Sequence, residues 1–308
     1  MKKLIVDNAK INLSTRRIIA IFLLILTTIL WGSSFILTKN ITQDVPVFLY
    51  LGLRFSIALF GFIPFIFHIK HLNKKIIIMG FITGLLFFFG MAFQTSGLQL
   101  TTAGKTGFIT GLSTIIVPFL AWFVYKKPMS LRIWIAVILS VIGMAFLFLE
   151  GETTSGIIIG DILVLICAFF FAFYIVLNDK FVHISDIYLY SMIQIFVITI
   201  SSFIASFFFR ESYDIFPMPL NFWLIMIYLG IGVMGLAILF QNWSQQHIGP
   251  TQTAIIFTLE PVFAALFGFI IGNEILSTFG WIGSGLIFAA ILITVLKNTN
   301  IIKNSREN

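Results

Sequence analysis

The chain is divided into long apolar runs, each about as long as an α-helix must be to cross a bilayer. A crossing helix takes about 20 residues, and ten such runs follow one another. They cover residues 18–37, 46–67, 76–98, 104–125, 133–149, 157–177, 187–209, 222–242, 253–272 and 279–296. Because 59% of the residues are hydrophobic and only 10% are charged, a soluble domain would have no way to bury this surface. The sequence predicts an all-α polytopic membrane protein with ten transmembrane helices.

Lys and Arg are distributed unequally between the two sides of the predicted membrane. Fifteen of the 19 fall on one side, and only Lys39 and Arg210 fall on the other. Positive residues are retained on the cytoplasmic side, so we expect a multi-pass protein of the cell (inner) membrane with both tails, 1–17 and 297–308, in the cytoplasm. The net charge of +7 follows from this topology, and no nucleic-acid partner is expected. We expect the lipid bilayer to surround the protein.

A weak internal repeat relates the two halves of the sequence. At an offset of 140 residues Arg54 aligns with Gln194, and at an offset of 147 Gln94 aligns with Gln241. The matches keep their order along the chain, and the offset changes once, which favours a duplication over chance.

The repeat predicts how the two halves are oriented. Residues 1–150 and 151–308 would each hold five helices, and because five is odd the second copy enters the membrane inverted. Two inverted five-helix repeats around a central site are the architecture of secondary transporters that work by alternating access. The alternative is that the repeat was retained only for packing.

Three ionisable side chains inside predicted spans are candidates for function, because an unpaired charge there costs several kcal/mol. Arg54 either binds an anionic group of a solute or donates to backbone carbonyls of neighbouring helices. Glu260 either changes its protonation, with Arg54 as its expected partner within the membrane, or is a structural acid beside the carbonyl that Pro261 leaves free. Lys105 is either a solute ligand or an anchor at the membrane interface.

Polar side chains inside the bundle are the candidates for solute binding. Amides in such positions offer both a donor and an acceptor to a polar solute. The predicted contacts are Ser33, Ser34, Arg54, Gln94, Tyr174, Gln194, Gln241 and Glu260. Pro118 and Pro261 each remove one helical hydrogen bond, and we interpret them as hinges at similar places in the two halves.

Signatures of enzymes are absent from the sequence, and no cofactor is expected. His68 and His71 lie three residues apart at the end of a predicted span, but no acidic residue is near them in the sequence. A metal site is therefore not predicted.

Four motifs resemble those of the EamA-type ten-helix branch of the drug/metabolite transporter superfamily. They are Trp31-Gly32-Ser33-Ser34-Phe35, Arg54-Phe55, Thr102-Ala103-Gly104-Lys105-x-Gly107-Phe108 and Leu259-Glu260-Pro261-Val262-Phe263-Ala264-Ala265-Leu266. The resemblance implies a carrier with a central cavity that commonly exports amino acids or other metabolites, and it implies that the fifth and tenth helices are peripheral. One departure is that the first half has Lys126-Lys127-Pro128 where Gly-Glu is common.

Residues and resemblance together favour a secondary transporter for a small-molecule solute, with coupling to protons as one option for Glu260. An exchanger for organic or sugar phosphates, with Arg54 and Lys105 holding the anion, is an alternative. A membrane enzyme or sensor that transports nothing is a second alternative. Neither the solute nor the oligomeric state follows from the sequence.

The predicted topology gives a direct test. Reporter fusions after Lys127 and at the C-terminus should report the cytoplasm, and fusions near Glu152 and Asp214 should report the outside, because the basic loops stay inside. A C-terminal reporter found outside would remove one span and with it the division into five plus five helices.

Overall fold

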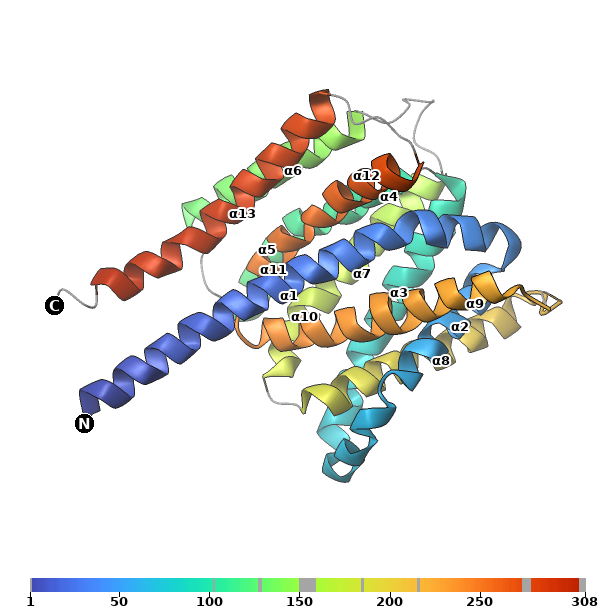
Figure 1. Cartoon of the computed structure of the whole chain (residues 1–308), viewed down its shortest axis with the longest axis horizontal. Coiled ribbons are helices and arrows are strands. Elements are labelled where there is room, and N and C mark those ends of the chain that lie inside the picture. The colour runs from blue at the N-terminus through green and yellow to red at the C-terminus, as the bar shows by residue number, and fades with distance from the viewer. Residues whose placement is uncertain are drawn as a thin grey trace.

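The computed structural model describes residues 2–101, 103–126, 129–149, 159–183, 186–214, 217–272 and 278–304, and throughout these ranges the regular structure is helical (Figure 1). In chain order the elements are α1 (Lys2–Asp44), α2 (Val47–Phe60), η1 (Ile63–His71), α3 (Lys74–Leu100), α4 (Ala103–Gly111), α5 (Ser113–Tyr125), α6 (Leu131–Leu149), α7 (Ile159–Val182), α8 (Ile187–Phe208), α9 (Leu220–Ile227), η2 (Tyr228–Leu236), α10 (Ala237–Gln245), α11 (Pro250–Phe257), α12 (Leu259–Gly272) and α13 (Thr278–Asn304). The prediction of an all-α polytopic protein is confirmed.

Seven helices of the described residues are long and apolar enough to cross a membrane, or eight if a bent pair counts as one span. The pair is Val47–Phe60 and Ile63–His71, which meet at 79°. The predicted span over 46–67 is therefore not one continuous α-helix but two helical segments with a sharp bend between them. Pro64 has no N–H to donate to the carbonyl four residues earlier, so the α-helix ends and a 3₁₀ segment follows. The apolar helices Leu131–Phe146 and Thr278–Thr294 are shorter, so ten spans stay a prediction.

The outer surface of the bundle is apolar. Phe67, Phe123, Phe207 and Phe208 are each more than 75% exposed. Such side chains are stable against lipid and not against water. The outer surface is therefore apolar, as the composition predicts for a multi-pass membrane protein.

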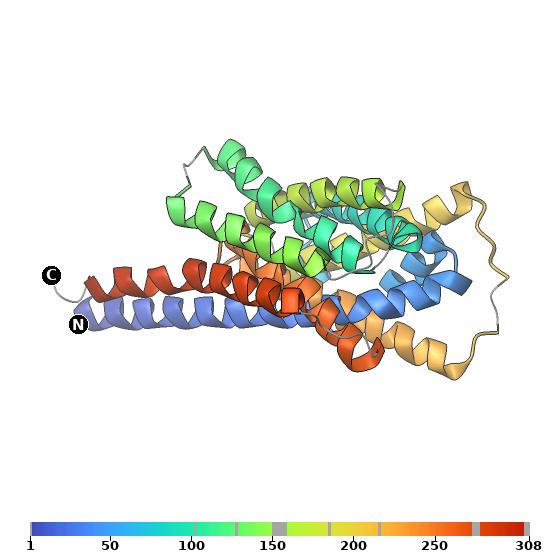
Figure 2. The ribbon, with the colours of Figure 1, turned by 90° about the horizontal axis from the view of Figure 1, so that it is seen from above.

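The two halves of the chain interleave in one bundle. α3 packs along α7 and α8, α2 packs along α8, and α1 packs along α10 and α12. The start of α1 and the end of α13 lie at the same end of the molecule (Figure 2). Helices of both halves therefore surround the same interior.

α6 and α13 form a pair at one edge of the bundle (Figure 1). They approach closely at Gly143, where a Cβ atom would lie 2.6 Å from the carbonyl oxygen of Gly283. This edge position agrees with what the family resemblance implies for the fifth and tenth predicted helices.

Two glycines make similar close contacts between the halves. A Cβ at Gly84 in α3 would lie 3.0 Å from the carbonyl oxygen of Gln194, and a Cβ at Gly230 in η2 would lie 2.8 Å from that of Arg54. Gln194 and Arg54 are the residues that the repeat aligns. Each half thus places a glycine of one helix against the backbone of the other half.

These contacts predict a specific loss of stability. Gly230→Ala should lower the melting temperature of the purified protein in detergent, because overpacking costs about 1–3 kcal/mol and exceeds the ~0.5–1 kcal/mol that Ala gains in a helix. Gly235→Ala is the matched control in the same segment, since its Cβ would meet only ordinary contacts at 3.5 Å or more. Equal melting temperatures for the two variants would contradict the close approach.

Candidate functional site

A cavity lies between the two halves of the bundle. Its walls come from α1, α2, α3, α4, α5, α7, η2, α10, α11 and α12, and the space between them, including the part open to solvent, is about 780 Å³. Six of the eight predicted solute contacts line it: Ser34, Arg54, Gln94, Tyr174, Gln241 and Glu260. The structure thus brings together side chains from both halves that are up to about two hundred residues apart.

Arg54 is the charged group with the deepest burial at this cavity. Its side chain is 1% exposed. Nε donates to the carbonyl oxygen of Leu229 (3.2 Å), and Nη1 donates to the hydroxyls of Tyr50 (3.0 Å) and Thr38 (3.4 Å). Nη2 is buried without a hydrogen-bond partner, and no carboxylate of the described residues forms an ion pair with the guanidinium. A cation held in this way is positioned by neutral groups, and the two N–H donors of Nη2 are still free to bind an acceptor.

Two short helical breaks bring polar groups to the opposite wall. The chain turns at Leu112 between α4 and α5, and at Thr258 between α11 and α12. Thr114, just after the first break, donates to the carbonyl oxygen of Ala254, just before the second (3.2 Å). The breaks therefore face each other and expose the starts of α5 and α12 to the cavity.

Glu260 is in the first turn of α12, two residues after the second break. Its side chain lines the cavity, and within the described part of the chain it has no hydrogen bond or ion pair. The ion pair with Arg54 that the sequence suggested is not formed in this conformation. The carboxyl group can therefore exchange a proton or meet a cationic group of a solute.

The predicted hinges lie close to these breaks but not at them. Pro261 lines the cavity three residues after Thr258, and its ring lies 3.4 Å from the Cβ position of Gly107 in α4. Pro118 is buried inside α5, six residues after Leu112. Whether either proline acts as a hinge stays a prediction.

Three further predicted solute contacts, Gln94, Tyr174 and Gln241, are hydrogen-bonded to neighbouring side chains. Gln94 donates to Thr110 Oγ1 (3.2 Å). Tyr174 donates to Gln241 Oε1 at 3.5 Å, and Gln241 Nε2 reaches Gln245 Oε1 at 3.4 Å. The two bonds of Gln241 are long, and long bonds are exchanged at low cost for bonds to a solute.

In the Trp31-Gly32-Ser33-Ser34 run of α1, some residues pack against other helices and one faces the cavity. Trp31 donates to the carbonyl oxygen of Val233 (3.2 Å). A Cβ at Gly32 would lie 2.7 Å from Phe263 Cβ, so α1 and α12 approach each other only because residue 32 is glycine. Ser34 faces the cavity, whereas Ser33 is outside its lining and bonds to the Tyr228 hydroxyl (2.6 Å).

Gln194, the eighth predicted contact, is buried away from the cavity. Its Nε2 donates to Thr83 Oγ1 and Asn178 Oδ1, both at 2.9 Å, and its Oε1 accepts from Asn242 (2.8 Å). Both amide hydrogens are thus used. In this conformation Gln194 joins α3, α7, α8 and α10 and does not face a solute.

Arg54 and Gln194 belong to two hydrogen-bonded triads at corresponding positions. The first consists of Thr38, Tyr50 and Arg54, and the second of Asn178, Tyr190 and Gln194, each member 140 residues after its counterpart. In both, the tyrosine hydroxyl bonds to the side chain from the preceding helix. The offset at Arg54 was visible in the sequence, but the roles of Thr38 and Asn178 were missed.

A second missed pair lies where α5 ends beside α7. The Tyr125 hydroxyl donates to Asp179 Oδ2, while Asp179 Oδ1 is buried without a partner. Asp179 is 5% exposed. One signal was visible in the sequence, an acidic residue at the end of an apolar run, but its partner Tyr125 was not.

Lys105, the third ionisable residue predicted within a span, is in α4. Its side chain lies outside the described residues, so its two alternatives stay predictions.

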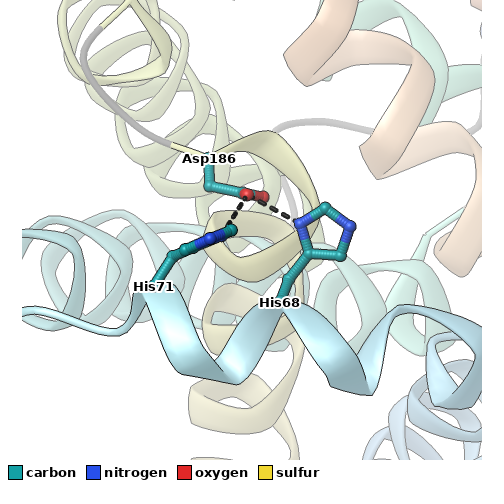
Figure 3. A group of neighbouring side chains, drawn as sticks. All are labelled: His68, His71 and Asp186. Atoms are coloured by element: carbon teal, nitrogen blue, oxygen red, sulfur yellow. Dashed lines mark hydrogen bonds and ion pairs between the residues drawn. The ribbon is translucent and has the colours of Figure 1, made fainter.

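One further polar cluster lies outside the cavity, where η1 meets the start of α8 (Figure 3). His68 Nδ1 is 2.7 Å from Asp186 Oδ2, and His71 Nδ1 is 3.6 Å from the same oxygen. The expectation that these histidines lack an acidic neighbour is wrong. Asp186 comes from a distant part of the sequence that folding brings beside them.

Fold and cavity together define a multi-pass membrane protein with a polar site between its halves. The EamA-like transporter family model matches twice, over residues 18–149 and 158–296. The chain therefore belongs to the EamA-like transporter family.

Individual proteins agree with this assignment. An uncharacterized transporter of Archaeoglobus fulgidus is 34% identical over 282 residues, which are 92% of this chain and 87% of that protein. The uncharacterized transporter YetK of Bacillus subtilis is 24% identical over 86% of this chain and 83% of its own. A solved crystal structure matches the fold with a TM-score of 0.75 at 18% identity, over 90% of this chain and 96% of the other. The protein is accordingly a transporter in the general sense of its family.

Proposed function

We propose that the chain is a secondary transporter that exports a small polar or amphipathic metabolite, such as an amino acid, by alternating access. The observation that carries this is Arg54, a buried cation at the cavity whose Nη2 lacks a partner. A carboxylate of the solute would supply the missing acceptor and the missing negative charge.

The rest of the lining suits an amphipathic solute. Glu260 offers a carboxyl group that can receive a cationic group or a proton. The apolar wall includes Phe87 and Phe171, whose rings lie 5.4 Å apart, and Trp31. Ser34, Gln94 and Gln241 add neutral hydrogen-bonding groups. Sites for small molecules combine an apolar wall with a few fixed polar groups in this way.

Two inverted repeats in the cell membrane, with both tails cytoplasmic, are part of this proposal. The double family match, the paired triads and the paired glycine contacts support an equivalence of the halves. Alternating access needs two arrangements of the same walls. At the breaks at Leu112 and Thr258, α5 and α12 could change direction while each of them stays helical.

The sites at which the cavity closes would lie beyond these breaks. Tyr125 and Asp179 join α5 to α7, and Asn178 joins α7 to α10 through Gln245 Oε1 (2.5 Å). In an alternating-access cycle these contacts would hold one side shut while the cavity is open to the other.

An exchanger of organic phosphates is the second candidate. Arg54 alone favours it, since a guanidinium binds phosphate as well as carboxylate. Competition by organic phosphates against uptake into vesicles separates the two. Solute flux in proteoliposomes tests both against a membrane protein that transports nothing.

The role of Arg54 predicts unequal effects of two substitutions. Arg54→Lys keeps the charge but loses the bidentate geometry and the bond to Leu229, so transport should fall at least ~10-fold with little loss of expression. Arg54→Gln copies the residue of the other triad and should also fold, but without transport. Transport at the wild-type rate by Arg54→Gln would contradict a contact between Arg54 and the solute.

The role of Glu260 is tested by one variant in two assays. If Glu260 couples proton movement to export, Glu260→Gln should keep solute exchange but lose accumulation driven by a pH gradient, since the amide carries no exchangeable charge. Full activity in both assays would mean a structural acid, and equal loss in both would mean a direct solute contact or misfolding. Either result would end the coupling role.

A further inference from the structure

The two histidines of η1 are presented side by side to one oxygen of Asp186. In a 3₁₀ helix residues three apart lie directly above one another, and His68 and His71 have this spacing at the end of Ile63–His71. Figure 3 shows both imidazoles on the same side of η1, facing the Asp186 carboxylate. The three ligand atoms lie within 4.8 Å of one another.

Asp186 is oriented by a second set of contacts. It caps α8, with Oδ1 accepting from the backbone N–H groups of Tyr188 (3.1 Å) and Leu189 (3.2 Å). Oδ2 is thereby turned toward the histidines. The group is therefore an anionic ligand with a fixed direction.

His68 is held in place by aromatic neighbours. The ring of Tyr188 stacks on Phe65 with centroids 4.4 Å apart and lies 4.8 Å from the His68 ring. His68 and His71 are 32% and 56% exposed in their side chains, and Asp186 is 20% exposed. The cluster is thus ordered on its buried side and open to ions on the other.

We propose that His68, His71 and Asp186 bind a divalent transition-metal ion of the Zn²⁺, Co²⁺ or Ni²⁺ type. Imidazole nitrogens favour these ions over Mg²⁺ and Ca²⁺, which take oxygen ligands. Metal–ligand distances of about 2.0–2.2 Å in a tetrahedral site separate the ligand atoms by roughly 3.3 Å. The observed 2.7 and 3.6 Å lie on either side of that value, so rotations of the side chains suffice.

The bound ion would tie the end of η1 to the start of α8. These segments come from different halves of the chain, 118 residues apart at His68 and Asp186. Three protein ligands leave a fourth position for water, which is typical of exchangeable sites. The proposal does not depend on which solute the cavity carries.

Calorimetric titration of the full-length protein with Zn²⁺ tests the site, with a purification tag that contains neither histidine nor cysteine. The wild type should bind one ion per chain, and His68→Asn, His71→Asn and Asp186→Asn should each weaken binding at least ~10-fold. Asp186→Asn is the sharpest variant, because asparagine also caps a helix but has no charge. His183→Asn, at an exposed histidine outside the cluster, is the control and should bind as the wild type does.

A second measurement needs no variant. Zn²⁺ should slow the modification of His68 and His71 by diethyl pyrocarbonate, read by peptide mass spectrometry, and leave His183 unaffected. Absence of one-to-one binding by the wild type would overturn the proposal. So would binding that survives all three substitutions, or binding that depends on His183 and not on His68.

Discussion

The interior of this bundle must satisfy its own polar groups, because the surrounding lipid offers no hydrogen bonds. Two triads at corresponding positions meet this requirement, and in each of them a side chain of the preceding helix bonds both to a tyrosine hydroxyl and to the residue one turn after that tyrosine. Thr38, Tyr50 and Arg54 form the first, and Asn178, Tyr190 and Gln194 the second. The contacts of α2 with η2 and of α8 with α3 are built around them.

The triads differ in what they leave unsatisfied, and only the first leaves a polar group without a partner beside the cavity. Gln194 uses both amide hydrogens within a network that includes Thr83, Asn178 and Asn242. Arg54 has one more donor group than its neighbours accept, and Nη2 stays without a partner beside the cavity. In the triad of Gln194 both amide hydrogens are thus paired and the residue holds helices together. In the triad of Arg54 one donor group stays unpaired.

The sequence predicted the class of fold and most of the cavity, because both depend on composition and on which residues are costly in lipid. Six of the polar residues predicted as solute contacts line one cavity. Ser33 and Gln194 are elsewhere, because the face that a side chain occupies depends on helix rotation, and neighbouring positions such as Ser33 and Ser34 differ by about 100°.

Contacts between distant segments were beyond the reach of sequence patterns. Nothing local to η1 indicates that the first residue before α8 will lie against its histidines, or that Tyr125 will donate to Asp179. The bend at Pro64 was readable in principle, since proline at the start of a helical segment ends the preceding one. It was hidden by the length of the apolar run around it.

The unequal triads also bear on how a solute would drive a conformational change. An unpaired cation in a medium of low dielectric constant is costly, and three neutral acceptors offset only part of that cost. An anionic solute beside Arg54 relieves the remainder only in conformations that keep the cavity around it. Since a ligand shifts an equilibrium by its difference in affinity for the two states, in the proposed alternating-access cycle this residual charge would couple occupancy to the position of the surrounding helices. A second cation at Gln194 would add the same cost without a solute to relieve it. The copy with glutamine is therefore suited to remain packed while the copy with arginine responds.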